Sequence, residues 1–83
     1  MKDLALTFEV LSESDLAFNV VDISAQEQTL VVGDVETIVS HIVEQYIASK
    51  VKIWIAKTDL GRLIGQSIEQ QGYTVEYLTL YFE

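Results

Sequence analysis

Apolar and polar residues alternate along three segments in the early part of the chain. The segments span residues 4–11, 16–23 and 28–32, and Phe8 lies on the apolar face of the first. A period of two residues is typical of a half-buried β-strand, because successive side chains point to opposite sides of a sheet. Polar turn formers fill residues 12–15 between the first two segments. The pattern predicts three strands, the first two joined as an antiparallel hairpin.

After Gly33 the spacing of the apolar residues changes to a helical one. Seven apolar residues recur at i, i+3, i+4, i+7, i+8, i+11 and i+12, namely Val35, Ile38, Val39, Ile42, Val43, Tyr46 and Ile47. They form one stripe on an α-helix, which we expect to pack on the sheet. Asp34 is the expected N-cap, and Lys50 lies where a cation complements the C-terminal end of the helix dipole.

The rest of the chain predicts a strand, a helix and a second strand. Residues 51–56 alternate, and a helix capped by Thr58 or Asp59 then runs to Gln71. Its narrower apolar stripe consists of Leu60, Leu63, Ile64 and Ile68. Residues 73–82 predict a long last strand. A right-handed parallel crossover is expected to join the strands on either side of this helix.

These elements predict one α+β domain over residues 1–83, a mixed five-stranded sheet in the order β-β-β-α-β-α-β with two helices packed on it. Hydrophobic residues make up 49% of the chain, which is enough for a folded core, and cysteine is absent, so packing must stabilise it. No apolar run is long enough to span a bilayer, and the start of the chain lacks the plan of a signal peptide. We therefore expect a cytoplasmic protein without membrane contact.

Negative charge is concentrated in the first 49 residues, which hold nine acidic side chains and a single base, Lys2. Residues 50–83 hold four acids and four bases, so the formal net charge of −8 comes from the first part. A field of one sign repels nucleic acid and attracts basic surfaces, so direct nucleic-acid binding is not expected. The leading hypothesis is a non-enzymatic domain that binds the basic surface of another protein through acids such as Glu9, Glu13, Asp15, Asp22 and Glu27.

In composition the chain resembles small, acidic, cysteine-free inhibitors encoded by phages, including anti-CRISPR and anti-restriction proteins. This resemblance implies a phage or mobile-element protein that occupies the basic nucleic-acid-binding surface of an enzyme. Electrostatic steering would make the capture fast.

Tyr73, Tyr77 and Tyr81 share one face of the expected last strand. Tyrosine combines a large contact area with a polar tip and is enriched at binding hot spots, so this face is a second candidate partner surface. Alternatively, helices cover both faces of the sheet and the tyrosines belong to the core. The edge of the last strand could also pair with a copy of itself, which makes a homodimer or a self-assembling structural subunit a further hypothesis.

The order of elements resembles the RNase H-like fold of ribonucleases H, resolvases and terminase nucleases, with similar residue texture over residues 51–77. The resemblance implies a metal-dependent nuclease that holds two divalent ions with carboxylates. By position Glu9 matches the first carboxylate and Asp59 the third, with Glu36 or Glu44 as a loose second. The glycine-containing turn usual after the first carboxylate is absent here.

The residue types alone, without any resemblance, suggest two further candidates, a metal site and His41. Glu9, Asp22 and Asp59 could bind Mg²⁺ if they converged, because hard cations prefer oxygen ligands. Helical spacing places His41 away from the apolar stripe, so an exposed histidine is expected. Neither a dinucleotide-binding glycine motif nor a phosphate-loop lysine is present.

Overall fold

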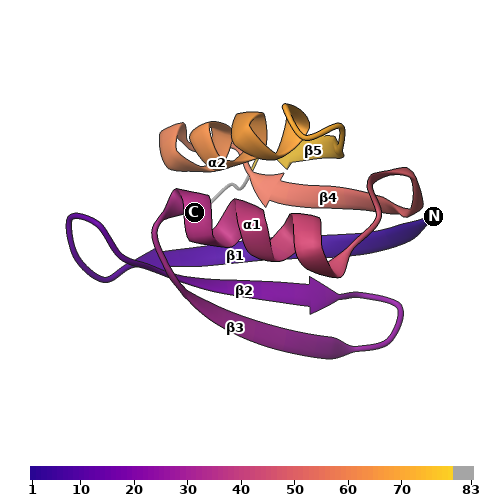
Figure 1. Ribbon diagram of the computed structural model, residues 1–83, viewed down its shortest axis with the longest axis horizontal. Coiled ribbons are helices and arrows are strands. Elements are labelled where there is room, and N and C mark those ends of the chain that lie inside the picture. Colours follow the sequence, from indigo (N-terminus) through magenta and orange to yellow (C-terminus); the bar gives the residue numbers. More distant parts are fainter. Residues whose placement is uncertain (80–83) are drawn as a thin grey trace.

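The computed structural model describes residues 1–79 and confirms the α+β fold with its mixed five-stranded sheet and two helices (Figure 1). In chain order the elements are β1 (Lys2–Val10), β2 (Leu16–Asp22), β3 (Glu27–Gly33), α1 (Val35–Gln45), the 3-10 turn η1 (Ala48–Lys50), β4 (Val51–Ala56), α2 (Asp59–Glu69) and β5 (Thr74–Leu78). No helix in the described part of the chain is long and apolar enough to cross a membrane.

The sheet has the strand order β3-β2-β1-β4-β5. β1 pairs antiparallel with β2, and β2 with β3, whereas β1 and β4 pair parallel, as do β4 and β5. The two parallel pairs follow from the chain order, because α1 returns the chain to β4 beside β1 and α2 returns it to β5. β3 and β5 are therefore the two edges of the sheet.

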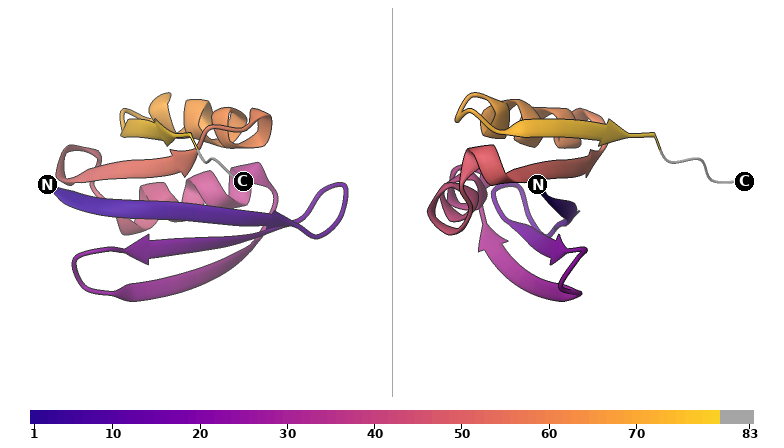
Figure 2. Two further views of the ribbon diagram at one scale, coloured as in Figure 1. Left: turned by 180° about the vertical axis from the view of Figure 1, so that it is seen from behind. Right: turned by 90° about the vertical axis from the view of Figure 1, so that its right-hand side faces the viewer.

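Both helices lie on the same face of the sheet. Alternate residues of β1, β2 and β4 are buried beneath them, and the side chains between these positions point to the opposite face. Seen from behind, β1, β2 and β3 lie in front of α1, and no described element covers the strands (Figure 2). The fully buried core consists of Leu4, Phe18, Val20, Ile38, Ile42, Ile53, Ile55, Ile64 and Ile68. Within residues 1–79 the sheet thus has one covered and one bare face.

Helix α1 begins as the sequence predicts and ends earlier. The Asp34 carboxylate accepts hydrogen bonds from the Thr37 amide (2.8 Å) and hydroxyl (2.7 Å), which confirms it as the N-cap. The helix ends at Gln45, so Ile47 leaves the helical stripe and is exposed. Within the helix Val43 is also exposed, and Ile38 and Ile42 are the fully buried members of the predicted stripe. The buried contact is therefore narrower than the periodicity implies.

Helix α2 packs on the sheet through glycine. Thr58 caps it, because its Oγ1 accepts from the Gly61 amide at 2.9 Å, and the helix ends at Glu69. Gly61 and Gly65 are buried against the sheet, while Leu63 of the predicted stripe is exposed. A side chain at Gly61 would overlap the carbonyl oxygen of Ala56, so the helix can lie this close to the end of β4 only with glycine there.

Strand β5 has five residues and ends at Leu78, short of the strand predicted over residues 73–82. Residues 80–83, and with them Tyr81, lie outside the described part of the chain. Gly72 precedes the strand with a φ of +91°, a left-handed conformation that glycine adopts without steric cost.

Candidate protein-binding site at the hairpin end

The five acids predicted to bind a partner lie at opposite ends of the sheet. Glu9, Glu13 and Asp15 belong to the β1–β2 hairpin end, whereas Asp22 and Glu27 face each other at the far end of β2 and β3. β2 separates the two groups by about 20 Å, given roughly 3.4 Å per residue. This is more than two screening lengths at physiological salt, so the groups do not form one acidic surface.

Asp22 has a structural role. Its side chain is only 8% exposed, its carboxylate lies 2.9 Å from the Lys2 ammonium, and it accepts a hydrogen bond from the Ala25 amide at 3.2 Å. The hydrogen bond from Lys2, followed by that from Ala25, lowers the pKa of Asp22 below its usual value. The Asp22 carboxylate thus stabilises its own chain, and a contact of Asp22 with a partner stays a prediction.

The three carboxylates of the hypothetical magnesium site do not come together. Glu9 points to the bare face of the sheet, Asp22 lies on the covered face at the other end, and Asp59 is exposed in the first turn of α2. Across residues 1–79 no three His, Cys, Asp or Glu side chains are placed to hold one metal ion.

Tyr73 and Tyr77 face the helices. Tyr73 is buried, and its hydroxyl donates to the carbonyl oxygens of Ile42 (3.3 Å) and Tyr46, which ties the end of α1 to β5. Tyr77 packs under α2, and its hydroxyl donates to a Glu69 carboxylate oxygen at 2.6 Å. Burial and this hydrogen bond raise the pKa of Tyr77 to about 12. The interpretation of these tyrosines as a partner surface is corrected for Tyr73 and Tyr77, since both contribute to packing.

An open hollow of about 420 Å³ lies where the β1–β2 hairpin meets the first turns of α1 and α2. Five of its lining residues are apolar, and we call them the floor: Val10, Leu16, Val35, Leu60 and Leu63. The other five are polar, and we call them the rim: Ser12, Glu13, Ser14, Asp34 and Glu36. Val10 is 61% exposed and Leu63 54%, so the floor presents apolar surface to solvent. The hollow thus combines an exposed apolar surface with acidic side chains.

The end of the molecule that carries this hollow is acidic because acids in the β1–β2 hairpin and at the N-terminal ends of both helices gather there. The parallel arrangement of β1 and β4 brings the hairpin and the first turns of both helices to one end of the sheet (Figure 1). Six acids lie there with two bases, and these are Glu9, Glu13, Asp15, Asp34, Glu36 and Asp59 with Lys57 and Arg62. Acids in the first turn of a helix are favoured by its dipole. Asp34 is engaged as a cap, and its hydrogen bonds with Thr37 lower its pKa.

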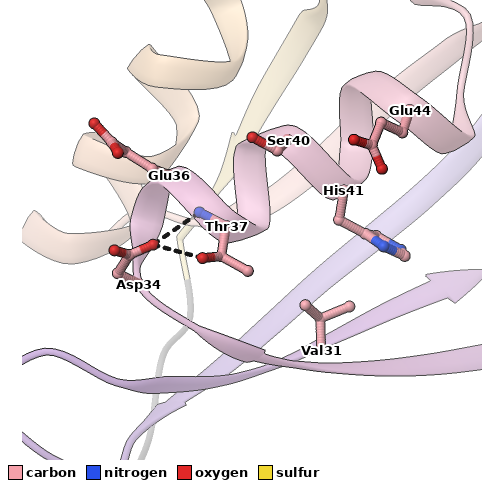
Figure 3. A pocket seen from close by; sticks show the side chains of 7 residues that line it. All are labelled: Val31, Asp34, Glu36, Thr37, Ser40, His41 and Glu44. Carbon is pink, nitrogen blue, oxygen red and sulfur yellow. Dashed lines mark hydrogen bonds between the residues drawn. The ribbon is translucent and has the colours of Figure 1, made fainter.

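A second hollow of about 510 Å³ runs along α1 beside β3, and it shares Asp34 and Glu36 with the first (Figure 3). His41 is half-buried here and lines the hollow together with Val31, which corrects the prediction of an exposed histidine (Figure 3). Glu36 and Glu44 are eight residues apart on the helix, or about 12 Å, so their carboxylates do not converge. We see no catalytic arrangement in this hollow.

Among the residues that line the hairpin-end hollow, the sequence analysis named Glu13 as a partner-binding residue. The apolar residues Val10 and Leu63 also line the hollow, and the periodicity places both on apolar faces of their elements. Both residues lie at the margin of those faces, where the periodicity cannot distinguish covered from uncovered positions. Comparison with protein-family models, curated proteins and solved structures finds no match to the chain.

Proposed function

We propose that this protein is a non-enzymatic protein-binding domain whose hairpin end holds a basic partner. The observation that carries the proposal is that the exposed acids Glu13 and Glu36 line one hollow together with exposed apolar residues, among them Val10 and Leu63. Such a site fits an apolar side chain flanked by lysine or arginine. The distribution of charge favours this end over the one with Asp22, where Lys2 neutralises the nearest carboxylate.

The floor and the rim have different roles in this proposal. Burial of a leucine-sized side chain contributes about 1.5–3 kcal/mol, whereas an exposed ion pair contributes about 0.2–1 kcal/mol. The apolar floor therefore supplies most of the affinity. The rim orients the partner and raises the association rate through its long-range field.

We further propose that the partner is a nucleic-acid enzyme. The acidic end of this protein would then occupy the basic binding surface of that enzyme, as an inhibitor of phage or mobile-element origin would. Basic surfaces that bind phosphate backbones also attract carboxylates, and a net charge of −8 favours such an encounter. The hairpin loop, which projects beyond the sheet, makes this end accessible to a groove (Figure 1).

Binding of a basic amphipathic peptide is expected to weaken with salt. A suitable probe is a short helical peptide with a leucine stripe flanked by lysines, labelled for fluorescence anisotropy. Because the rim attracts the lysines, we expect the dissociation constant to rise about tenfold as salt increases from roughly 50 to 500 mM. A matched peptide with glutamates in place of the lysines should bind at least tenfold more weakly at low salt. Equal binding of both peptides, or an affinity independent of salt, would contradict the proposal.

The resemblance to RNase H-like nucleases is supported by the order of strands and helices alone. Glu9, which it would assign to metal binding, lies on the bare face of the sheet, whereas Asp59 belongs to the first turn of α2 on the covered face. A metal-dependent nuclease is therefore not the function that the geometry supports best.

A further inference from the structure

The edge strand β3 lacks the features that normally keep a sheet edge from pairing. It has seven residues, Glu27–Gly33, and within the described sheet it pairs with β2 alone. It contains no proline and no lysine, and its one charged residue, Glu27, stands at its first position. Natural proteins usually protect an open edge with charge, proline, a bulge or a covering element. An edge of this length without such protection suits pairing with another strand.

We propose that β3 pairs antiparallel with β3 of a second copy, which joins two five-stranded sheets into one of ten strands. This inference is independent of the proposed function, since it uses another part of the molecule. In the register of full overlap the two-fold axis passes through Leu30, which lies opposite its own copy. Glu27 then lies opposite Gly33 of the other chain, so no like charges lie directly opposite each other within the paired strands.

The side chains of β3 favour this arrangement. Leu30 is 61% exposed and Val32 55%, and both lie on the bare face of the sheet. In the symmetric pair the two copies of Leu30 come into contact at the axis, with Val32 beside them. Pairing would therefore remove apolar surface from water and satisfy the backbone N–H and C=O groups that point away from β2.

The opposite edge of the sheet suits self-pairing less well. The described strand β5 has Glu76 at its centre, so the same symmetric arrangement would place two Glu76 carboxylates opposite each other. Like charges directly opposite are destabilising, and Glu76 already lies 3.6 Å from Lys52 of its own chain. The charge pattern thus favours a homodimer through β3 over the homodimer through the last strand that the sequence suggested.

Only one strand from each copy forms the contact, so we expect an interface below about 1,200 Å² and a dissociation constant in the micromolar range. Each copy carries a net charge of −8, and the two copies repel. Screening this repulsion should strengthen the dimer. Its salt dependence is therefore opposite in sign to that of binding to a basic partner, which keeps the two proposals distinguishable.

Sedimentation velocity over roughly 1–300 µM tests the dimer with two variants at one position. Leu30→Lys and Leu30→Glu should each be monomeric, because each places like charges opposite each other at the axis. An equimolar mixture of the two should recover the dimer, because lysine then lies opposite glutamate. Val43→Lys, an exposed residue of α1 with the same change of charge as Leu30→Lys, should dimerise like the wild type.

Far-ultraviolet circular dichroism establishes that each variant is folded, which is expected because the Leu30 side chain is largely exposed. A wild-type protein that stays monomeric over the whole range would overturn the proposal. A dimer that persists in Leu30→Lys, or a mixture that stays monomeric, would overturn it as well.

Discussion

Replacing Gly61 with alanine is expected to lower the free energy of unfolding by about 3 kcal/mol. Alanine is normally the more favourable residue inside a helix, by about 1 kcal/mol. Here the added Cβ would overlap the backbone oxygen of Ala56 and lie 3.0 Å from the Thr58 hydroxyl oxygen. The carbonyl cannot easily turn aside, because it belongs to the last residue of β4, so α2 must shift away from the sheet.

Urea unfolding followed by circular dichroism measures the loss at Gly61. Gly65→Ala is a second glycine replacement for comparison. Its Cβ would meet the ring and hydroxyl of Tyr77, a side chain that can move, so a smaller loss of unfolding free energy is expected than at Gly61. Gln66→Ala, on the exposed side of α2, is the control and should change stability by less than about 0.5 kcal/mol. An alanine at position 61 that matches or stabilises the wild type would mean that α2 does not lie this close to β4.

Replacing Phe18 with alanine is expected to cost about 3–5 kcal/mol, because the side chain is fully buried between the sheet and the helices. For a domain of this size such a loss corresponds to a fall of at least about 12 °C in the melting temperature. Leu30→Ala, a truncation on the neighbouring strand that faces the bare side, should cost less than about 1 kcal/mol in the monomer.

The contrast between Phe18 and Leu30 tests whether the sheet is covered on one face only. Thermal unfolding should be measured at low micromolar concentration, so that association through β3 does not add to the stability. Similar losses at the two positions would indicate that both faces are buried.

The sequence predicts the order and type of the elements because these depend on the spacing of apolar residues close together in the chain. The two-residue alternation in β1 and β4 and the cap at Asp34 involve residues close together in the chain, and all three are confirmed. The residues at which the helices end depend less on the local sequence. α1 stops at Gln45 although the apolar spacing continues to Ile47, because the chain must turn there toward β4.

The arrangement in space limits how much of the candidate site the sequence can predict. A periodicity shows that Tyr73 and Tyr77 share a face, but which face the helices cover depends on the packing of the whole sheet. In the same way, nothing in the sequence indicates that Lys2 and Asp22, twenty residues apart, form an ion pair. The concentration of acids was visible from composition, whereas its division between two ends depends on the hairpin register.

A comparison of two charge reversals tests most directly whether the hairpin end is the binding surface. Glu13→Lys and Glu27→Lys change the net charge equally, and both residues are exposed, but they lie at opposite ends of the sheet. With the lysine–leucine peptide at low salt, Glu13→Lys should raise the dissociation constant about five- to tenfold, and Glu27→Lys should change it less than about twofold. Equal weakening by the two variants, or a larger effect of Glu27→Lys, would contradict binding at the hairpin end.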